Sequence, residues 1–122
     1  MNIEELRDYC LSKKGAIECF PFDEVTLVFK IHKMFALTNL DGNLSVNLKC
    51  DPEKAIELRE KYPAVKPGYH MSKKLWNTVE IDGSINDSLI KSWIDDSYQL
   101  VFDSLTKKQK EEVNHLENNK NK

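Results

Sequence analysis

An alternation of apolar and polar side chains with a period of two residues constrains this chain most. Apolar residues occupy every second position over residues 25–31, and the pattern returns over residues 44–48. Successive side chains of a strand point to opposite faces of a sheet, so each segment would bury one face. The chain is expected to turn at His32-Lys33, and Asp41-Gly42 is a strong hairpin signal. The sequence therefore predicts an antiparallel meander of three strands over residues 25–31, 34–40 and 44–49.

Capping signals predict four helices around this meander. An asparagine at position 2 and a threonine at position 106 are each followed three residues later by glutamate or glutamine, the pattern of a capping box. Asp51 precedes a proline at the first helical position, and Asn86 precedes a long apolar stripe of helical period. The predicted helices cover residues 3–13, 52–62, 87–105 and 107–116. Residues 16–24 are expected to form a connecting loop.

The stretch from residue 66 to residue 83 combines a turn, a basic cluster and a strand. Pro67-Gly68 is a turn pair, because proline presets its own φ and glycine tolerates the tight backbone that follows. Residues 76–81 are mostly β-branched and aromatic, which predicts a strand closed by the next turn. This hairpin would add a fourth strand to the sheet, and a fifth if the segment before the turn also pairs. Trp76 is expected to be partly buried and to anchor the hairpin.

The order of these elements predicts an α+β fold, a single domain over residues 1–116 in which helices back an antiparallel sheet. Residues 117–122 are polar and are expected to form a frayed tail. A chain of 122 residues is long enough for one core without disulfides or a structural metal.

Composition argues against several classes of protein. The three cysteines lack Cys-x-x-Cys spacing, which argues against a disulfide framework or a zinc site, so buried reduced thiols are expected. No apolar run approaches the roughly 20 residues that a bilayer demands, and the acidic amphipathic start does not resemble a signal peptide. We therefore expect a cytoplasmic protein without membrane contact, and a monomer rather than an obligate oligomer.

Catalytic and metal-binding signatures are scarce. The chain has four glycines and neither a phosphate-cradling glycine loop nor a nucleophile elbow. His32, His70 and His115 have no metal partner at helical spacing. Asp95 and Asp96 are neighbours on a predicted helix, which aims them in different directions. These features lead us to expect no enzymatic activity, no cofactor and no metal.

Several distinctive short motifs are spread along most of the chain. They are Phe35-Ala36-Leu37, Asp41-Gly42, Leu48-Lys49-Cys50-Asp51-Pro52-Glu53, Pro67-Gly68-Tyr69-His70, Lys73-Lys74, Trp76-Asn77-Thr78-Val79, Asp82-Gly83, Asp87-Ser88-Leu89-Ile90 and Ser97-Tyr98. In combination they resemble the MmcQ/YjbR family of small bacterial proteins, up to about residue 113. Relatives commonly carry a histidine immediately before the tryptophan, where this chain has Leu75.

The resemblance implies a frataxin-like (CyaY-like) fold, which agrees with the predicted elements. It also implies DNA binding through a double-wing arrangement of hairpins. The residues expected to take part are Lys66, Tyr69, His70, Lys73, Lys74 and Asn77, joined by Lys30 and Lys33 from the first hairpin. The lysines would neutralise phosphates of duplex DNA while Asn77 or Tyr69 contacts the sugar–phosphate backbone. Such contacts would be largely independent of base sequence.

The formal net charge of −2 leaves an alternative open, because dedicated nucleic-acid binders are usually basic. The alternative is a non-enzymatic module that binds a protein partner or a small ligand on the outer face of the sheet. Its residues would be Ser45, Asn47, Tyr69, Trp76 and Thr78. A third interpretation follows from the frataxin-like fold and places iron on acidic residues of the first helix. Only three are available, at positions 4, 5 and 8, too few for a carboxylate ridge.

Overall fold

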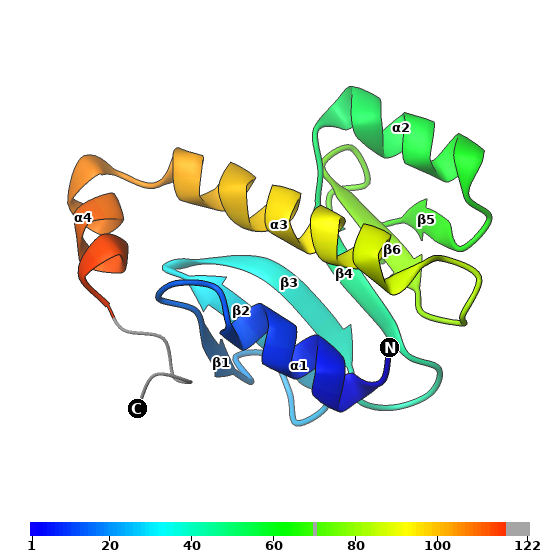
Figure 1. Cartoon of the computed structure of the whole chain (residues 1–122), viewed down its shortest axis with the longest axis horizontal. Coiled ribbons are helices and arrows are strands. Elements are labelled where there is room, and N and C mark those ends of the chain that lie inside the picture. Colours follow the sequence, from blue (N-terminus) through cyan, green and yellow to red (C-terminus); the bar gives the residue numbers. More distant parts are fainter. Residues whose placement is uncertain (70, 117–122) are drawn as a thin grey trace.

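The computed structural model describes residues 1–69 and 71–116, which form one α+β domain (Figure 1). Its elements in chain order are α1 (Ile3–Leu11), β1 (Ile17–Cys19), β2 (Thr26–Ile31), β3 (Lys33–Asn39), β4 (Ser45–Lys49), α2 (Pro52–Lys61), β5 (Val65–Pro67), β6 (Trp76–Glu80), α3 (Asp87–Ser104) and α4 (Lys107–His115). The predicted tail at residues 117–122 and the predicted site residue His70 lie outside the described residues.

The strands form a single antiparallel sheet in the order β1-β2-β3-β4-β6-β5. The predicted meander is its centre, with the turn at His32, whose φ is +64°, and Gly42 at φ +78° in the next turn. Both segments of the predicted hairpin pair, so β5 and β6 complete one side. The sheet ends in two short edge strands, β1 and β5, of three residues each.

Strand β1 corrects the sequence prediction, which placed residues 16–24 in a loop. Ile17 lies opposite Lys30 and Cys19 lies opposite Val28 of β2. A strand of three residues is too short to show an alternating pattern, and Ile17 is 48% exposed. The pairing therefore depends on the neighbouring strand rather than on a local signal.

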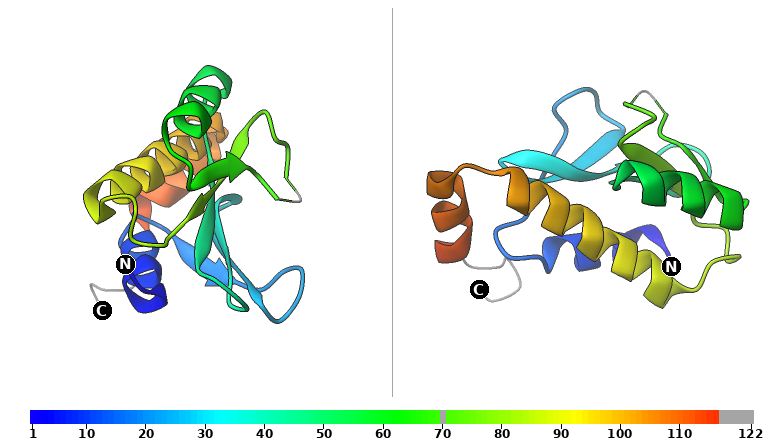
Figure 2. Two further views of the ribbon diagram at one scale, coloured as in Figure 1. Left: turned by 90° about the vertical axis from the view of Figure 1, so that its right-hand side faces the viewer. Right: turned by 90° about the horizontal axis from the view of Figure 1, so that it is seen from above.

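The helices cover one face of the sheet, where the main core lies (Figure 2). Leu6 of α1, Ile94 of α3 and Val113 of α4 enter the same cluster as the inward-facing residues of β2, β3 and β4. Phe29 and Phe35 are fully buried there. The alternation seen in the sequence therefore predicts the buried face correctly.

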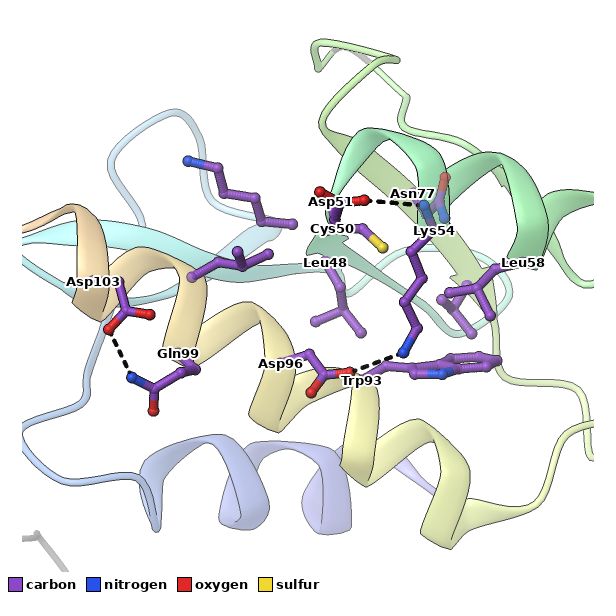
Figure 3. Close-up of a pocket in the computed structure, with 13 residues that line it drawn as sticks. Leu48, Cys50, Asp51, Lys54, Leu58, Asn77, Trp93, Asp96, Gln99 and Asp103 are labelled. Atoms are coloured by element: carbon purple, nitrogen blue, oxygen red, sulfur yellow. Dashed lines mark hydrogen bonds and ion pairs between the residues drawn. The ribbon is translucent and has the colours of Figure 1, made fainter.

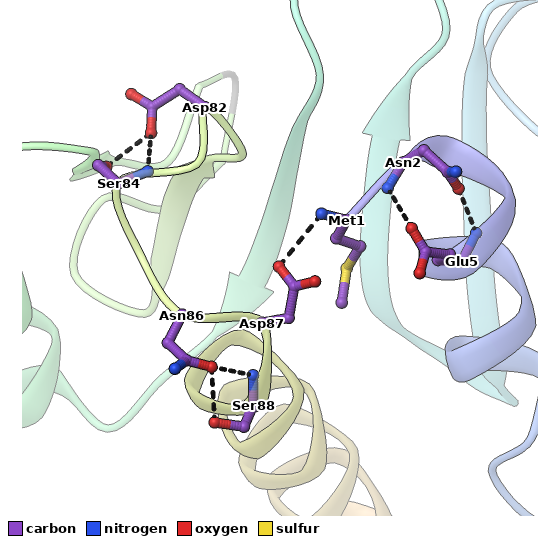
Figure 4. A network of polar contacts seen from close by, with 8 residues as sticks. All are labelled: Met1, Asn2, Glu5, Asp82, Ser84, Asn86, Asp87 and Ser88. Atoms are coloured by element: carbon purple, nitrogen blue, oxygen red, sulfur yellow. Dashed lines mark hydrogen bonds and ion pairs between the residues drawn. The ribbon is translucent and has the colours of Figure 1, made fainter.

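Caps at the helix N-termini follow the sequence prediction (Figure 4). The side chain of Asn2 accepts from the backbone N–H of Glu5, and the Glu5 carboxylate accepts from the backbone N–H of Asn2. Asn86 accepts a backbone N–H in the first turn of α3. The ammonium group of Met1 lies 3.1 Å from a carboxylate oxygen of Asp87, so the starts of α1 and α3 are joined.

The opposite face of the sheet, which we call the helix-free face, carries a smaller apolar cluster. It consists of Val28, Leu37 and Trp76, with partly buried side chains packed around them. Trp76 is 8% exposed, which confirms that it anchors the hairpin. A Cβ atom on Gly68 would lie 2.8 Å from the Cβ of Trp76, so only glycine permits this close approach.

The three cysteines are free thiols. Cys10 is buried as expected, whereas Cys19 and Cys50 are half-buried, so the prediction of buried thiols holds for one of the three. Burial raises the pKa of the Cys10 thiol to about 12. In the part of the chain that the structure describes, no helix is long and apolar enough to cross a membrane.

Candidate binding groove on the helix-free face

A groove of about 470 Å³ crosses the helix-free face between two loops. One loop, residues 20–25, joins β1 to β2, and the other joins β5 to β6 and is described at residues 68–69 and 71–75. Figure 2 (left) shows both loops projecting on the side of the sheet away from α1 and α3. A volume of this size lies within the range of small-molecule sites.

The floor of the groove is a chain of hydrogen bonds across β4 and β6. The hydroxyl of Thr78 accepts from the backbone N–H of Tyr69 (3.0 Å) and donates to the side-chain oxygen of Asn47. Because the amide oxygen of Asn47 is occupied, its NH₂ group is the part that can donate to a ligand. These bonds fix Tyr69, near the start of the hairpin loop, against the sheet and hold the floor in one arrangement.

Asp23 is the one charged side chain among the described residues that line the groove. Its carboxylate accepts from the backbone N–H groups of Val25 (2.9 Å) and Thr26 (2.6 Å) and from the Thr26 hydroxyl (3.1 Å). These hydrogen bonds, above all the one from the Thr26 backbone, lower the pKa of the Asp23 carboxyl. The groove therefore carries a negative charge at neutral pH.

Exposed aromatic side chains stand on both loops beside this floor. Phe22 is 63% exposed and Tyr69 is 62% exposed, and both line the groove. Phe20, in the same loop as Phe22, is 48% exposed. Apolar side chains scattered singly over a surface are common, whereas exposed apolar side chains that gather in one patch are typical of a binding surface.

The loop of residues 20–25 is the part of this groove that sequence reasoning missed, since it was predicted only as a connection. Two aromatic residues around Pro21 were the available signal, because a surface loop has no core of its own in which to bury them. The alternative set was largely correct in its grouping: Ser45, Asn47, Tyr69 and Thr78 all line the groove. Trp76 does not, because it is buried in the apolar cluster with Val28 and Leu37.

Three of the five lysines predicted to contact DNA have partners within the molecule. Lys66 forms an ion pair of 3.1 Å with Glu80. The ammonium groups of Lys33 and Lys73 each lie 3.5 Å from a backbone carbonyl oxygen. Lys74 is exposed and Lys30 is half-buried.

These lysines also fall into two separate groups. Lys30 and Lys33 flank the turn between β2 and β3, whereas Lys66, Lys73 and Lys74 belong to the hairpin of β5 and β6. In the order of the sheet the strands of the two hairpins are two to four spacings apart, roughly 10–19 Å.

The placement of Asn77 corrects the predicted set. Asn77 is 2% exposed and its side chain points to the helix-covered side, where its NH₂ group donates to the carbonyl of Ala55 in α2 (3.2 Å). Alternation along β6 puts Thr78, not Asn77, on the helix-free face. Asn77 therefore cannot contact a ligand on the same surface as Tyr69.

Metal ligands do not gather in the described part of the chain, where no group of three or more histidine, cysteine, aspartate or glutamate side chains could hold an ion. On α1, Glu5 is engaged in the helix cap.

Comparison with known proteins places this sheet and its loops in a family. The family model described as YjbR matches residues 11–100, which covers β1 to β6 and most of α3. The chain belongs to the YjbR family. It is 36% identical over 107 residues to the uncharacterized protein YjbR of Escherichia coli K12, covering 86% of this chain and 91% of that one. The uncharacterized protein YbdF of Escherichia coli O157:H7 is 42% identical over 97 residues, covering 78% of this chain and 80% of the relative.

Two solved structures share the fold of this YjbR-family chain. The crystal structure of Deinococcus radiodurans protein DR2400 has a TM-score of 0.87 and 38% sequence identity, with 93% of this chain and 88% of that chain covered. A crystal structure of a Pseudomonas syringae protein has a TM-score of 0.74 and 31% identity, with 83% and 99% covered.

Proposed function

We propose that this YjbR-family protein is a binding protein rather than an enzyme, and that its ligand occupies the groove on the helix-free face. The observation that carries the proposal is the fixed polar floor of Asn47 and Thr78 between exposed aromatic side chains of two loops. Ligand sites commonly combine apolar walls with a few well-placed polar groups.

The charge of the groove indicates what kind of ligand it would accept. Asp23 supplies a carboxylate, and the side-chain NH₂ of Asn47 supplies a donor. A phosphate or carboxylate would be repelled by Asp23, whereas a planar cation would pair with it and stack against Phe22 or Tyr69. We therefore propose a neutral or positively charged ligand with a planar group.

A matched pair of probes tests this proposal. Benzamidine and benzoate have nearly the same shape and opposite charges. In a ¹⁵N-resolved NMR titration, benzamidine should shift the backbone amide signals of Asn47, Tyr69 and Thr78, and benzoate should shift them far less. Substitution Asp23→Asn should remove most of the difference between the two probes. Equal shifts for both probes, or no shifts in the groove at millimolar benzamidine, would contradict the proposal.

Duplex DNA remains a second candidate because Lys73 and Lys74 are exposed on a projecting loop. Contacts to about three or four phosphates would make log affinity fall with log salt at a slope near −3, a loss of roughly 60-fold between 50 and 200 mM salt. Replacing Lys73 and Lys74 by glutamine should flatten the slope by about 2, whereas the same change at Lys107 and Lys108 of α4 should not.

Fluorescence anisotropy of a labelled duplex measures these slopes. Unrelated duplexes should bind alike, because phosphates carry no base sequence. Absence of binding at tens of micromolar protein in 50 mM salt would rule out the DNA candidate and leave the groove as the functional surface.

A further inference from the structure

A second cavity lies on the helix-covered side of the sheet, between α2 and α3 (Figure 3). Its volume is about 280 Å³, larger than the roughly 150 Å³ of an apolar cavity that accepts benzene. Leu48 and Val79 contribute from β4 and β6, and Leu58 and Trp93 contribute from the two helices. A molecule of one or two rings would therefore find mainly apolar contacts here.

One buried polar atom in the lining lacks a partner. Asn77 lines this cavity, and its side-chain oxygen is the buried side-chain acceptor that receives no hydrogen bond from the described residues. The orientation of the amide is defined, because its nitrogen donates to the carbonyl of Ala55, which can only accept. A buried amide oxygen without a donor is unfavourable, so a ligand N–H or O–H that reaches it by displacing the groups that cover it would be stabilising.

Charges at the mouth of the cavity do not favour an anion. Lys54 of α2 reaches across to Asp96 of α3, with 3.6 Å between the ammonium and the carboxylate (Figure 3). Asp51, Asp103 and Lys49 also line the cavity, so three acidic residues face two basic ones there. Burial raises the pKa of the Cys50 thiol, which keeps it protonated at neutral pH. An uncharged ligand with a donor group fits this lining better than a phosphate or carboxylate.

We propose that the cavity between α2 and α3 is a second binding site, for an uncharged heteroaromatic molecule of one or two rings that donates an N–H to Asn77. The apolar walls hold the rings, and the amide oxygen of Asn77 selects molecules with a donor. The site lies on the opposite side of the sheet from the groove that contains Asn47 and Thr78, so it is independent of the proposed function.

Indole and benzofuran test this site, because they have nearly the same shape and differ in the N–H, which an ether oxygen replaces in benzofuran. Indole should shift the amide signals of residues that line the cavity, in a saturable manner, with the millimolar Kd expected of a fragment. Benzofuran should bind at least about five-fold more weakly, the effect of one lost hydrogen bond. Equal affinity for the two probes would overturn the role of Asn77.

A pair of tryptophan substitutions distinguishes indole binding in this cavity from binding elsewhere on the surface. Leu100 lines the cavity on α3 and is 37% exposed, so Leu100→Trp should fill the mouth without disturbing the core. Ile56 on α2 is 51% exposed and does not line the cavity, so Ile56→Trp is the matched control. Indole binding should be lost in the first variant and retained in the second. Binding that survives Leu100→Trp, shifts confined to the groove, or no saturable shifts at millimolar indole would each overturn the proposal.

Discussion

At the scale of single residues, the hydroxyl of Ser97 joins α3 to two strands. It is fully buried, donates to the carbonyl of Phe35 in β3 (2.6 Å) and accepts from the backbone N–H of Lys49 in β4 (2.9 Å). The sequence pattern holds no information about which backbone groups the side chain of Ser97 reaches. A single side chain thus satisfies a donor and an acceptor that the sheet leaves unpaired.

Substitution Ser97→Ala should lower the free energy of unfolding by about 1–3 kcal/mol, because it leaves buried backbone groups without partners. Urea denaturation measures this loss. The control is Ser92→Ala on the same helix, whose hydroxyl donates only to the carbonyl of Leu89 in that helix and whose loss should have little effect. Equal destabilisation by the two substitutions would show that the hydrogen bonds from Ser97 to β3 and β4 do not contribute to the free energy of unfolding.

Asp23 should give the groove a defined pH dependence. Its pKa is lowered in the folded state, so its hydrogen bonds to Val25 and Thr26 are present above the unfolded-state pKa and are lost as the pH falls through the folded-state value. The amide signals of Val25 and Thr26 should titrate with a midpoint below about 3.9. Asp23→Asn should abolish this titration. A midpoint at or above 3.9 would mean that the loop is not held as described.

At the scale of elements, α3 is the helix that the sheet packs against most closely. Ile90, Ile94 and Val101 are buried against the same core as Val46 and Leu48 of β4. This arrangement confirms the prediction from the apolar stripe of α3 and the alternation of β4.

Truncating a side chain at the centre of the contact between α3 and the sheet tests this arrangement. Ile94→Ala should lower the free energy of unfolding by about 2–5 kcal/mol, the cost of a buried cavity, in a domain whose total stability is about 6–18 kcal/mol. The same change at Ile56, which is 51% exposed on α2, is the control and should cost far less. The two denaturation midpoints provide the comparison, and similar midpoints would mean that the core has been misplaced.

Helices and strands that carry a cap or a periodic apolar pattern in their own residues were predictable from the sequence. Strand β1, which carries neither, was not. Each helix begins at a predicted cap, with the capping boxes at Asn2 and Thr106 both formed. Strand β1 carries no periodic pattern in its three residues, and its pairing comes from contact with β2. The boundary error at α1, which ends at Leu11 rather than residue 13, is of the size expected where helix ends fray.

At the scale of the whole molecule, the candidate site depends on how distant segments meet. Tyr69 and Thr78 are near in sequence, but the loop of residues 20–25 reaches the same groove only through the fold. Sequence reasoning grouped the lysines by charge and did not foresee that Lys66 pairs with Glu80. It also assigned Asn77 a contact with the DNA backbone, whereas the alternation of β6 buries Asn77 on the helix-covered side. Side-chain direction and tertiary pairing, rather than composition, determine which residues come together in the groove on the helix-free face.

The two edges of the sheet determine how the protein can recognise a partner. Each edge strand offers three residues, and Pro67 at the end of β5 has no N–H to donate. Such an edge is too short to template an added strand from another chain. Short edges of this kind disfavour recognition by main-chain pairing, which reads many sequences alike. They favour selection of a partner by side chains, and the same edges should keep the protein from seeding fibrils at high concentration.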